Sequence, residues 1–411
     1  MNMMKNISGL LLRYHRLKQN ISQEGLCKGI CVVSYVSKIE QGKVQPSPEI
    51  ITALFDRLHI TYHHDSAFLA MNEKALHKCI EGLYYGCRDI AFEETVIQRH
   101  EELLNSPLCA GYLLFLAYMR FHEKKDIHKE LEELSTLLPC FSDEQLFYYH
   151  YLMGCNHSAS FEHCRFHLHE AGKYQNLCIL DHALGLLYAD IGDYSLSLDY
   201  QQSAYRKACD EGHIEVMKYA SMHIANCYSN LQAESLMLKY YTQCSHICRF
   251  VNDRSLEGII YYNIGSTYLQ WKDYEQGETY LLKSYDLFDE MDQEMKFLLL
   301  QKLSLLYVEN LQPDKGRLYL ERMPAYLEQG DEDRYKLLAF IQLRYEPDYL
   351  QNKQYVEVLE AICKGDDKKL FYGIRIFHMM YLVEAYRYHR RYKEAADLMV
   401  QMRKFPINRI K

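Results

Sequence analysis

Three stretches of the chain align with one another without a gap, and this internal repetition constrains the fold more than any other feature. The stretches are HALGLLYADIGDYSLSLDY (182–200), HIANCYSNLQAESLMLKYY (223–241) and NIGSTYLQWKDYEQGETYL (263–281). A small residue lies near the start of each, and the interval from Gly185 to Ala225 and from Ala225 to Gly265 is 40 residues both times. Units of this length bury their apolar faces by stacking on one another. The repetition therefore predicts an elongated array and not a single compact core.

Each stretch is typical of a helical hairpin. A small residue and a following tyrosine mark the first helix, and an aromatic residue marks the second helix. The small residue lets the two helices approach, and the tyrosine fills the gap between neighbouring units. This pattern resembles the tetratricopeptide repeat, whose usual period is about 34 residues, so the longer period here implies longer helices or loops. The small residues are Gly185, Ala225 and Gly265, and the aromatic pairs are Tyr188 with Tyr200, Tyr228 with Tyr240 and Tyr268 with Tyr280.

Less regular units surround these three. A fourth lies around Tyr307 and Tyr319, and a last one reads YLVEAYRYHRRYKEAADLM over 381–399. Residues 73–180 show helical pairs with weak signatures, which we interpret as divergent repeats. Only eight prolines occur in 411 residues, which favours long uninterrupted helices. We expect an all-α chain, with an N-terminal helix-turn-helix bundle followed by a right-handed superhelix of tetratricopeptide-like repeats.

The first 65 residues follow a different pattern. Apolar residues at helical spacing over 7–17 predict a first helix, which Asn20 interrupts. Ser22 can cap a second helix, and Gly29 can end it in a left-handed conformation. A third helix is expected over about 32–41, and a further apolar pattern after two prolines closes a small bundle. This segment is a complete small domain in the arrangement of a helix-turn-helix.

The predicted third helix has two different faces. Val36 and Ile39 fall on its packing face, while the opposite face would lie toward a DNA major groove. Glu40 stands at the unfavourable end of the helix dipole, so we expect Arg16 to form an ion pair with it. The segment 1–65 holds eight Lys and Arg against five acidic residues, although the whole chain has a net charge of −8. The residues expected to face DNA are Val32, Val33, Ser34, Ser37 and Lys38.

These residues resemble the Xre/Cro-type helix-turn-helix. Its pattern is met by Leu12 with Arg16, by Ser22-Gln23 with Leu26, by Ser37-Lys38-Ile39-Glu40-Gln41-Gly42 and by Pro46. The resemblance implies that Gln23, together with Val33, Ser34 and Lys38, contacts phosphates or base edges of a double-stranded operator. Val32 replaces a serine that many relatives carry. Apolar contact of Val32 and Val33 with thymine methyl groups is therefore expected.

The first helices of the second and third repeats carry an amide-rich face without acidic residues. Asparagine both donates and accepts hydrogen bonds, so a row of asparagines suits the backbone of an extended peptide. Lys302, at the matching place of the fourth repeat, could receive a peptide carboxylate. The residues expected to bind a peptide are His223, Asn226, Tyr262, Asn263, Ser266 and Lys302.

The combination of this head with long-period repeats resembles the peptide-pheromone regulators of Gram-positive bacteria, the Rap/Rgg/NprR/PlcR/PrgX group. The resemblance implies a quorum-sensing homodimer that binds operator DNA and a short linear signalling peptide. Asn226 and Asn263 match positions where such proteins grip the peptide backbone. The expected domains are a DNA-binding domain over 1–65, a linker over 66–75, and a repeat domain for peptide sensing and dimerisation over 76–411.

Two alternatives stay open at this point. The repeats could be a scaffold that docks a partner protein such as a response regulator. The Cys/His cluster over 155–169, or Cys244 with Cys248 one helical turn apart, could make the chain a metal or redox sensor. The sequence shows no catalytic motif, so we expect neither enzyme activity nor a cofactor. It also shows no apolar run of membrane-spanning length and no signal peptide, so we expect a cytoplasmic protein with no membrane partner.

Overall fold

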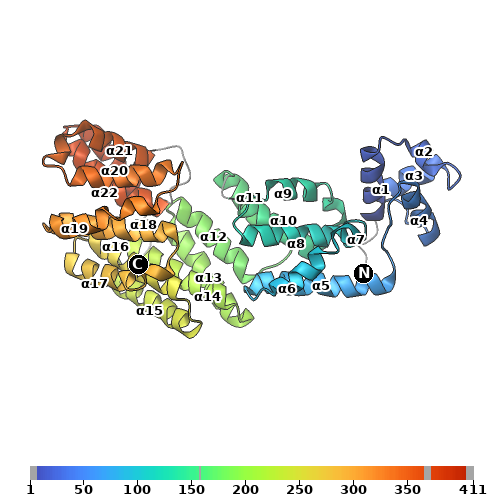
Figure 1. Ribbon diagram of the computed structural model, residues 1–411, viewed down its shortest axis with the longest axis horizontal. Helices are drawn as coiled ribbons and strands as arrows, with labels where there is room; N and C mark the ends of the chain where they lie inside the picture. The colour runs from blue at the N-terminus through green and yellow to red at the C-terminus, as the bar shows by residue number, and fades with distance from the viewer. Residues whose placement is uncertain (1–6, 157–158, 365–371, 404–411) are drawn as a thin grey trace. The chain divides into compact units, whose positions relative to one another are not determined.

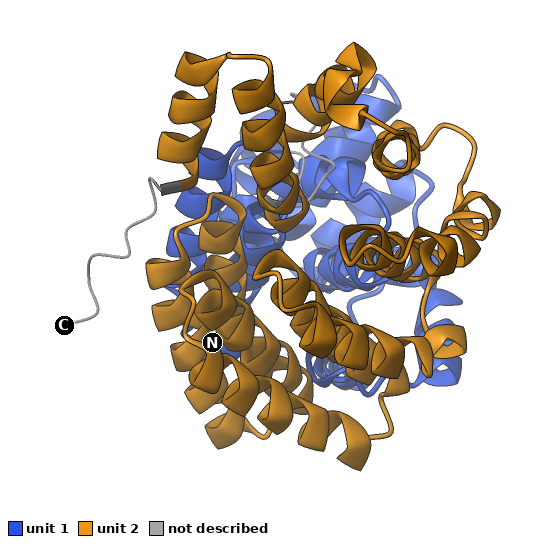
Figure 2. Ribbon diagram, turned by 90° about the vertical axis from the view of Figure 1, so that its left-hand side faces the viewer, with its two compact units in different colours: residues 1–180 blue, residues 181–411 orange. Residues whose placement is uncertain are grey.

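The computed structural model describes residues 7–156, 159–364 and 372–403, and every regular element within these ranges is a helix (Figure 1). The all-α prediction is therefore confirmed. The chain divides into two compact units, unit 1 over residues 1–180 and unit 2 over residues 181–411 (Figure 2).

Unit 1 begins with four short helices, which we name the head. Ser22 caps the second of them, since its Oγ accepts a hydrogen bond from the backbone N–H of Gly25 at 3.0 Å. Gly29 follows with φ +76°, a left-handed conformation that suits glycine. Val36 and Leu54 are fully buried between the helices. The head consists of α1 (Ile7–Lys18), α2 (Gln23–Cys27), α3 (Val33–Glu40) and α4 (Pro48–Arg57).

The rest of unit 1 follows the head after a short non-helical segment over residues 58–65. Residues 66–75, expected to be a linker, form the first half of α5. Tyr62 stacks on Phe55 of the head with ring centroids 4.3 Å apart, and the N–H of His63 donates to the carbonyl of Asn105 at 2.9 Å. The helices are α5 (Ser66–Tyr85), α6 (Ile90–Ile97), α7 (His100–Leu104), α8 (Cys109–His122), α9 (His128–Ser135), η1 (Leu138–Cys140), α10 (Asp143–Gly154) and α11 (Phe161–Ala171).

Unit 2 is a series of helical hairpins in sequence order (Figures 1 and 2). Its first six helices are α12 (Cys178–Asp190), which begins in unit 1, α13 (Tyr194–Glu211), α14 (Ile214–Asn230), α15 (Glu234–Phe250), α16 (Arg254–Gln270) and α17 (Tyr274–Tyr285). The remaining elements are η2 (Phe288–Glu290), α18 (Gln293–Glu309), α19 (Pro313–Leu320), η3 (Met323–Tyr326), α20 (Glu332–Arg344), η4 (Tyr349–Gln351), α21 (Lys353–Lys364), α22 (Tyr372–Tyr388) and α23 (Tyr392–Arg403).

The same tyrosine stack recurs in four successive hairpins. The ring centroids of the three pairs expected from the sequence lie 5.6, 5.6 and 5.9 Å apart, and Tyr307 stacks on Tyr319 at 5.8 Å. Small residues permit this packing, because a Cβ on Gly265 would stand 2.7 Å from Cγ of Leu281. The hairpins repeat in detail, which supports the interpretation of the sequence.

The packing around α18 differs from that of the hairpins before it. All eleven residues from Phe297 to Tyr307 are buried, so this helix is enclosed on every side over three turns. Its neighbours include α19, α20 and the preceding α17. The amphipathic pattern of the earlier repeats is lost here, because later parts of the chain cover the face that the earlier repeats leave partly open.

Candidate functional sites

Glu40 fixes the orientation of α3 in the head. Its carboxylate accepts two hydrogen bonds from Arg16, with Nε to Oε1 at 2.6 Å and Nη2 to Oε2 at 2.9 Å. Gln23 Nε2 donates a third bond to Oε2 at 2.7 Å. Both members of the ion pair are buried, and the hydrogen bond to Glu40 raises the pKa of Arg16. Breaking such a pair leaves an uncompensated buried charge, so α1, α2 and α3 are held as one rigid group.

The outer face of α3 presents apolar and cationic groups to solvent. Val32 is 67% exposed and Val33 42% exposed, and Ser34 and Lys38 are also exposed. Lys38 has no hydrogen-bond or ion-pair partner among the residues that the structure describes. Ser37 is half-buried, and its Oγ accepts a hydrogen bond from Gln41 Nε2 at 3.0 Å. This face can contact methyl groups and pair with phosphates, and DNA presents both.

Gln23 has a different environment from the other residues expected at DNA. It is half-buried, and its amide nitrogen is already bonded to Glu40. The sequence motif identified Gln23 as a contact residue, but could not show that the same amide completes the shell around Glu40. In this arrangement Gln23 positions α2 against α3.

Two asparagines of unit 2 meet on adjacent helices. Asn263 Nδ2 on α16 donates to Asn226 Oδ1 on α14 at 3.4 Å, and the hydroxyl of Tyr241 donates to the same oxygen at 2.5 Å. A hydroxyl pair, Ser229 with Thr267 at 2.8 Å, links the same two helices. We name the surface formed by His223, Asn226, Tyr262, Asn263 and Ser266 the amide face. The structure places these five residues on neighbouring helices, as the repeat alignment predicts.

The amide face is only partly open to solvent. His223, Asn226, Asn263 and Ser266 are half-buried, while Tyr262 is 8% exposed. Burial and then the nearby His182 lower the pKa of His223 to about 3, so its imidazole is neutral at physiological pH. The face therefore presents neutral hydrogen-bonding groups, and part of this capacity is used between the helices themselves.

Lys302 does not belong to that surface. It is 4% exposed, and its Nζ lies 3.0 Å from the ring centroid of Phe377 on α22. Burial lowers the pKa of Lys302 well below its usual value. The expectation of an open carboxylate-binding lysine is wrong in placement, because the last repeats fold over this position. Repeat alignment could not reveal this cover, since Phe377 lies far along the chain.

The Cys/His cluster forms a contact between α10 and α11. His150 Nδ1 and His167 Nδ1 are 2.8 Å apart, and the rings of His163 and His167 lie 4.5 Å apart. Burial and the neighbouring histidines lower the pKa of His167 to about 4. His157, part of the same stretch, lies outside the described residues. Among those that are described, no group of three or more His, Cys, Asp or Glu is arranged to hold a metal ion.

Cys244 and Cys248, the candidate redox pair, are both buried on α15. The Sγ of Cys244 donates a hydrogen bond to the backbone carbonyl of Lys218 at 3.1 Å. A hydrogen bond with the neighbouring Cys248, together with burial, raises the pKa of Cys244. Nucleophilic thiolates need the opposite conditions, an accessible site and a lowered pKa.

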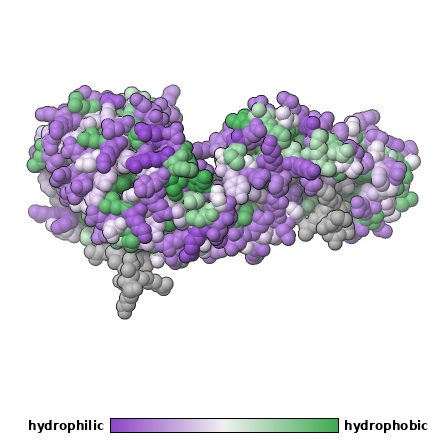
Figure 3. Space-filling model, turned by 90° about the horizontal axis from the view of Figure 1, so that it is seen from below, coloured by the Kyte–Doolittle hydropathy of each residue, from purple (hydrophilic) through white to green (hydrophobic). Residues whose placement is uncertain are grey.

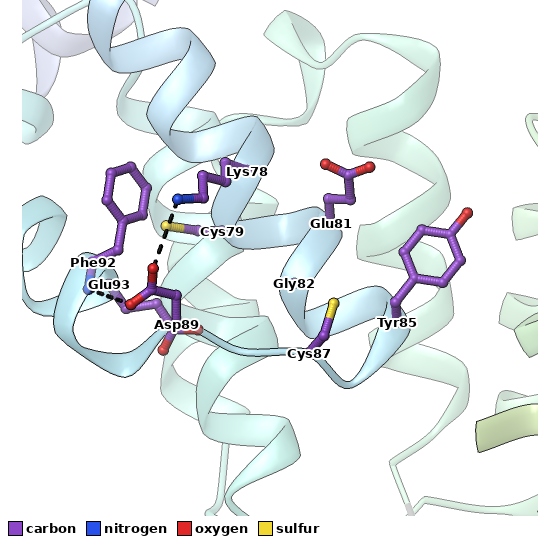
Figure 4. A pocket seen from close by; sticks show the side chains of 9 residues that line it. All are labelled: Lys78, Cys79, Glu81, Gly82, Tyr85, Cys87, Asp89, Phe92 and Glu93. Atoms are coloured by element: carbon purple, nitrogen blue, oxygen red, sulfur yellow. Dashed lines mark hydrogen bonds and ion pairs between the residues drawn. The ribbon is translucent and has the colours of Figure 1, made fainter. Parts of the chain in front are cut away.

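Helix α5 has a cavity on each of two faces. The smaller, of about 200 Å³, is lined by Lys78, Cys79, Glu81 and Phe92 among others (Figure 4). Lys78 covers the Phe92 ring at 4.0 Å and pairs with Asp89 at 3.7 Å, so its charge is already partnered. The larger cavity, of about 620 Å³, lies between α5, α8, α10 and the head. No sequence pattern predicted this cavity, because most of its wall comes from the divergent repeats.

The described part of the chain contains no helix that is both long and apolar enough to cross a bilayer. The face of the molecule shown in Figure 3 is mainly hydrophilic, with apolar residues scattered over it.

Comparisons with known proteins agree with this architecture. Residues 12–63 match the family model of a helix-turn-helix, and residues 259–290, which include most of α16 and all of α17, match that of a tetratricopeptide repeat. The chain is 26% identical over 259 residues to the transcriptional activator NprA of Geobacillus stearothermophilus. That alignment covers 58% of this chain and 62% of the relative, so the match spans less than two thirds of NprA.

Solved structures share the fold at low sequence identity. The apo form of the quorum sensor NprR from B. thuringiensis has a TM-score of 0.63 at 17% identity, over 82% of this chain and 99% of that chain. A Rap protein complexed with competence and sporulation factor has a TM-score of 0.67 at 15% identity, over 83% and 98% of the two chains. The resemblance to the Rap/Rgg/NprR/PlcR/PrgX regulators is thus confirmed in domain composition and in fold.

Proposed function

We propose that this chain, which combines a helix-turn-helix head with tetratricopeptide-like repeats, is a DNA-binding transcriptional regulator controlled by a short linear peptide. The observation that carries the proposal is the outer face of α3, where Val32, Val33, Ser34 and Lys38 are exposed on a helix that a buried ion pair holds in place. Exposed apolar groups beside a lysine without an ion-pair partner offer two kinds of contact at one place, and DNA presents thymine methyl groups and phosphates that match them.

In the head, one set of residues contacts the DNA, and another set holds α3 in position. Lys38 pairs with a phosphate and releases a bound counterion from the DNA. Its contribution to the affinity therefore falls as the salt concentration rises. Val32 and Val33, at the start of α3, contact thymine methyl groups, and Ser34 donates to a base edge or phosphate. Arg16, Glu40 and Gln23 act indirectly, because they fix the angle at which α3 enters the groove.

The repeat domain supplies the sensor in this proposal. NprA is named a transcriptional activator, and one NprR structure contains its cognate peptide NprX. In this chain the amide face offers neutral donors and acceptors on α14 and α16, which suit the backbone of an extended peptide. Asn226 Nδ2 has no partner among the described residues and is the first donor that we assign to a peptide carbonyl. Asn263 is the second contact, at the same level of the next helix.

The proposal includes a homodimer that works in the cytoplasm and has no catalytic role. Heads of this type read two half-sites of a symmetric operator, so a second copy supplies the second reading helix. Sedimentation of the purified chain with and without a selected duplex tests this part.

Selection of DNA from a random pool tests the main proposal. The full chain is incubated with duplexes that contain a random central segment, and bound sequences are counted. We expect enrichment of a motif with A·T pairs at the positions that face Val32 and Val33. The Ser34→Ala/Lys38→Ala variant should lose this enrichment, because Ser34 supplies a base contact that contributes about 1–3 kcal/mol of discrimination and Lys38 supplies the phosphate contact that holds α3 in the groove. Arg13→Ala, an exposed cation of α1, is the matched control.

No motif enrichment by the wild-type chain would contradict a role in sequence-specific DNA binding. Enrichment that survives in the Ser34→Ala/Lys38→Ala variant would place the DNA contact elsewhere in the head.

A further inference from the structure

The larger cavity of unit 1 has the size and lining of a ligand site. Its volume of about 620 Å³ lies within the range of about 300–1,000 Å³ that is usual for pockets that hold small ligands. Leu76 and Ile80 of α5, Leu114 of α8 and Tyr148 of α10 supply apolar surface. An apolar cavity that is open at a surface is filled at a gain in free energy by an apolar ligand.

The charge around this cavity is of one sign. Glu73 and Glu144 line it, and none of its sixteen lining residues is a lysine or arginine. Both carboxylates are exposed, and neither has a hydrogen-bond or ion-pair partner among the described residues. The pocket of Figure 4 differs in this respect, since Lys78 already pairs there with Asp89. The larger cavity therefore has an unmatched negative charge beside apolar surface.

Two amides add the ability to bind a backbone. Gln145 Oε1 accepts the N–H of Ser142 at 3.0 Å as part of the cap of α10, which leaves its Nε2 as a donor at the cavity wall. Gln45 of the head lines the same cavity and is exposed. An extended peptide needs such partners for its own N–H and C=O groups when it is buried.

The head contributes directly to this cavity through Ile7 and Gln45. An occupant would therefore touch α1 and the loop after α3, and also α5, α8 and α10 of the same unit. A ligand that binds one arrangement of head and repeats more tightly than another shifts the population toward that arrangement. Occupancy of the cavity is thus coupled to the orientation of the DNA-binding head.

We propose that this cavity binds a short apolar peptide segment with one positive charge, as a second peptide site besides the amide face. Only the expected effect of the peptide on DNA binding rests on the proposed function. Binding of the peptide to the cavity can be measured without DNA.

Gly111 offers a way to fill the cavity without disturbing its walls. A Cβ at this position of α8 would lie 3.5 Å from Gln145 Nε2 and 3.9 Å from Leu76 Cδ1, which are ordinary contact distances. Gly111→Ala should therefore be tolerated, and it should favour the helix, because glycine is a poor residue within helices. Gly111→Leu places a larger apolar group into the space that the peptide would occupy.

The experiment uses two pools of synthetic pentapeptides built from Leu, Phe and Val, one with a single Lys and one with a single Glu in each peptide. Peptides retained by the full chain are quantified by mass spectrometry. We expect the Lys pool to be retained about tenfold over the Glu pool, which corresponds to about 1.4 kcal/mol. Gly111→Leu should remove the excess retention of the Lys pool and leave only peptides held by the amide face, and Glu73→Gln/Glu144→Gln should remove the preference for Lys. Gly111→Ala and Glu81→Gln, the latter at the pocket of Figure 4, should behave like the wild type.

Equal retention of the two pools would overturn the inference. A Lys preference that survives Gly111→Leu but disappears in Asn263→Leu would also overturn it, while leaving the amide face and the proposed function intact. The segment 1–6, which contains Lys5, directly precedes Ile7 in the sequence and is tested as an alternative occupant. A Lys preference that appears only after deletion of residues 1–6 would show that this segment is the natural occupant, and would overturn the assignment to a separate peptide.

Discussion

Lys218 on α14 and Lys302 on α18 belong to the same repeat array and are 3% and 4% exposed, but among the described residues only Lys218 has carboxylates within ion-pair distance. Lys218 Nζ lies 2.7 Å from Glu215 Oε1 and 2.7 Å from Asp253 Oδ2. Burial alone would lower the pKa of Lys218, but hydrogen bonds to both carboxylates raise it. The Nζ of Lys302 lies against the ring of Phe377, and burial lowers the pKa of Lys302.

The difference separates two parts of unit 2. Around α14 and α16, polar and charged side chains bridge successive repeats, so a buried cation is matched by an acid from the next helix. Around α18, the later helices close over the corresponding face, and His378 bonds to Gln301 at 3.2 Å in a fully buried position. The early repeats leave a polar surface partly open, and the late repeats form a closed core.

Exchange of the two lysines for methionine gives the largest expected contrast. Lys218→Met should lower the free energy of unfolding by about 3 kcal/mol, because it leaves Asp253 and Glu215 without their cation. Lys302→Met should instead raise it by about 2 kcal/mol, because an unpaired buried base is replaced by an apolar side chain of similar length. Urea unfolding followed by the single tryptophan, Trp271 at the end of α16, reports on unit 2.

Equal destabilisation by both substitutions would contradict the comparison. Alkaline conditions supply a further check on Lys302. Because its folded pKa lies below the unfolded value, the unfolded state binds more protons, and stability rises with pH up to about pH 10.5. Lys302→Met should remove this part of the rise.

Acid should weaken the closed core through His378. Burial, and then the charge of Lys302, lower its pKa to about 3 from an ordinary value of 6.5. The unfolded chain takes up this proton first, so stability is complete above pH 6.5 and is lost as the pH falls toward 3. The expected loss between pH 6.5 and pH 5 is about 2 kcal/mol. His378→Phe should flatten this part of the pH profile in urea unfolding, and an unchanged slope would contradict the assignment.

The amide face should respond unequally to loss of its two asparagines. Asn226→Ala leaves the hydroxyl of Tyr241, a fully buried residue, without its acceptor, which should cost about 1.5 kcal/mol of stability. Asn263→Ala removes only the longer bond of 3.4 Å and should cost less than about 0.5 kcal/mol. Tyr241→Phe is the matched control, because it removes the hydroxyl that donates to Asn226. In the Tyr241→Phe background, Asn226→Ala should cause little further loss of stability. Additive effects in this double-mutant cycle would show that the bond contributes nothing.

A smaller effect than that of Asn226→Ala is expected at a helix cap that one repeat lacks. Asp193 and Asp273 cap α13 and α17, whereas Ala233 stands at the equivalent place before α15 and makes no side-chain cap bond. Ala233→Asp should therefore stabilise unit 2 by about 1 kcal/mol. A rise in the urea midpoint at constant slope would confirm it, and no rise would show that the three turns are not equivalent.

Local sequence patterns predicted the helices of the head and the hairpins from α12 to α19, because both follow from spacing within a few turns. The ion pair of Arg16 with Glu40 also came from a motif of fixed spacing. The burial of Lys302 under Phe377 could not be predicted, because it depends on contacts between distant repeats. The same holds for the bond between Asn226 and Tyr241, and for the cavity of unit 1, whose walls come from repeats with weak signatures.

The salt dependence of DNA binding tests the central claim most directly. The affinity of the full chain for a duplex that it has selected is measured at several salt concentrations, for the wild type and for Lys38→Ala. If the exposed face of α3 docks on DNA, the logarithm of the affinity falls linearly with the logarithm of the salt concentration, and loss of Lys38 reduces the slope by about 1. An affinity that does not depend on salt, or the same slope for both proteins, would contradict the account.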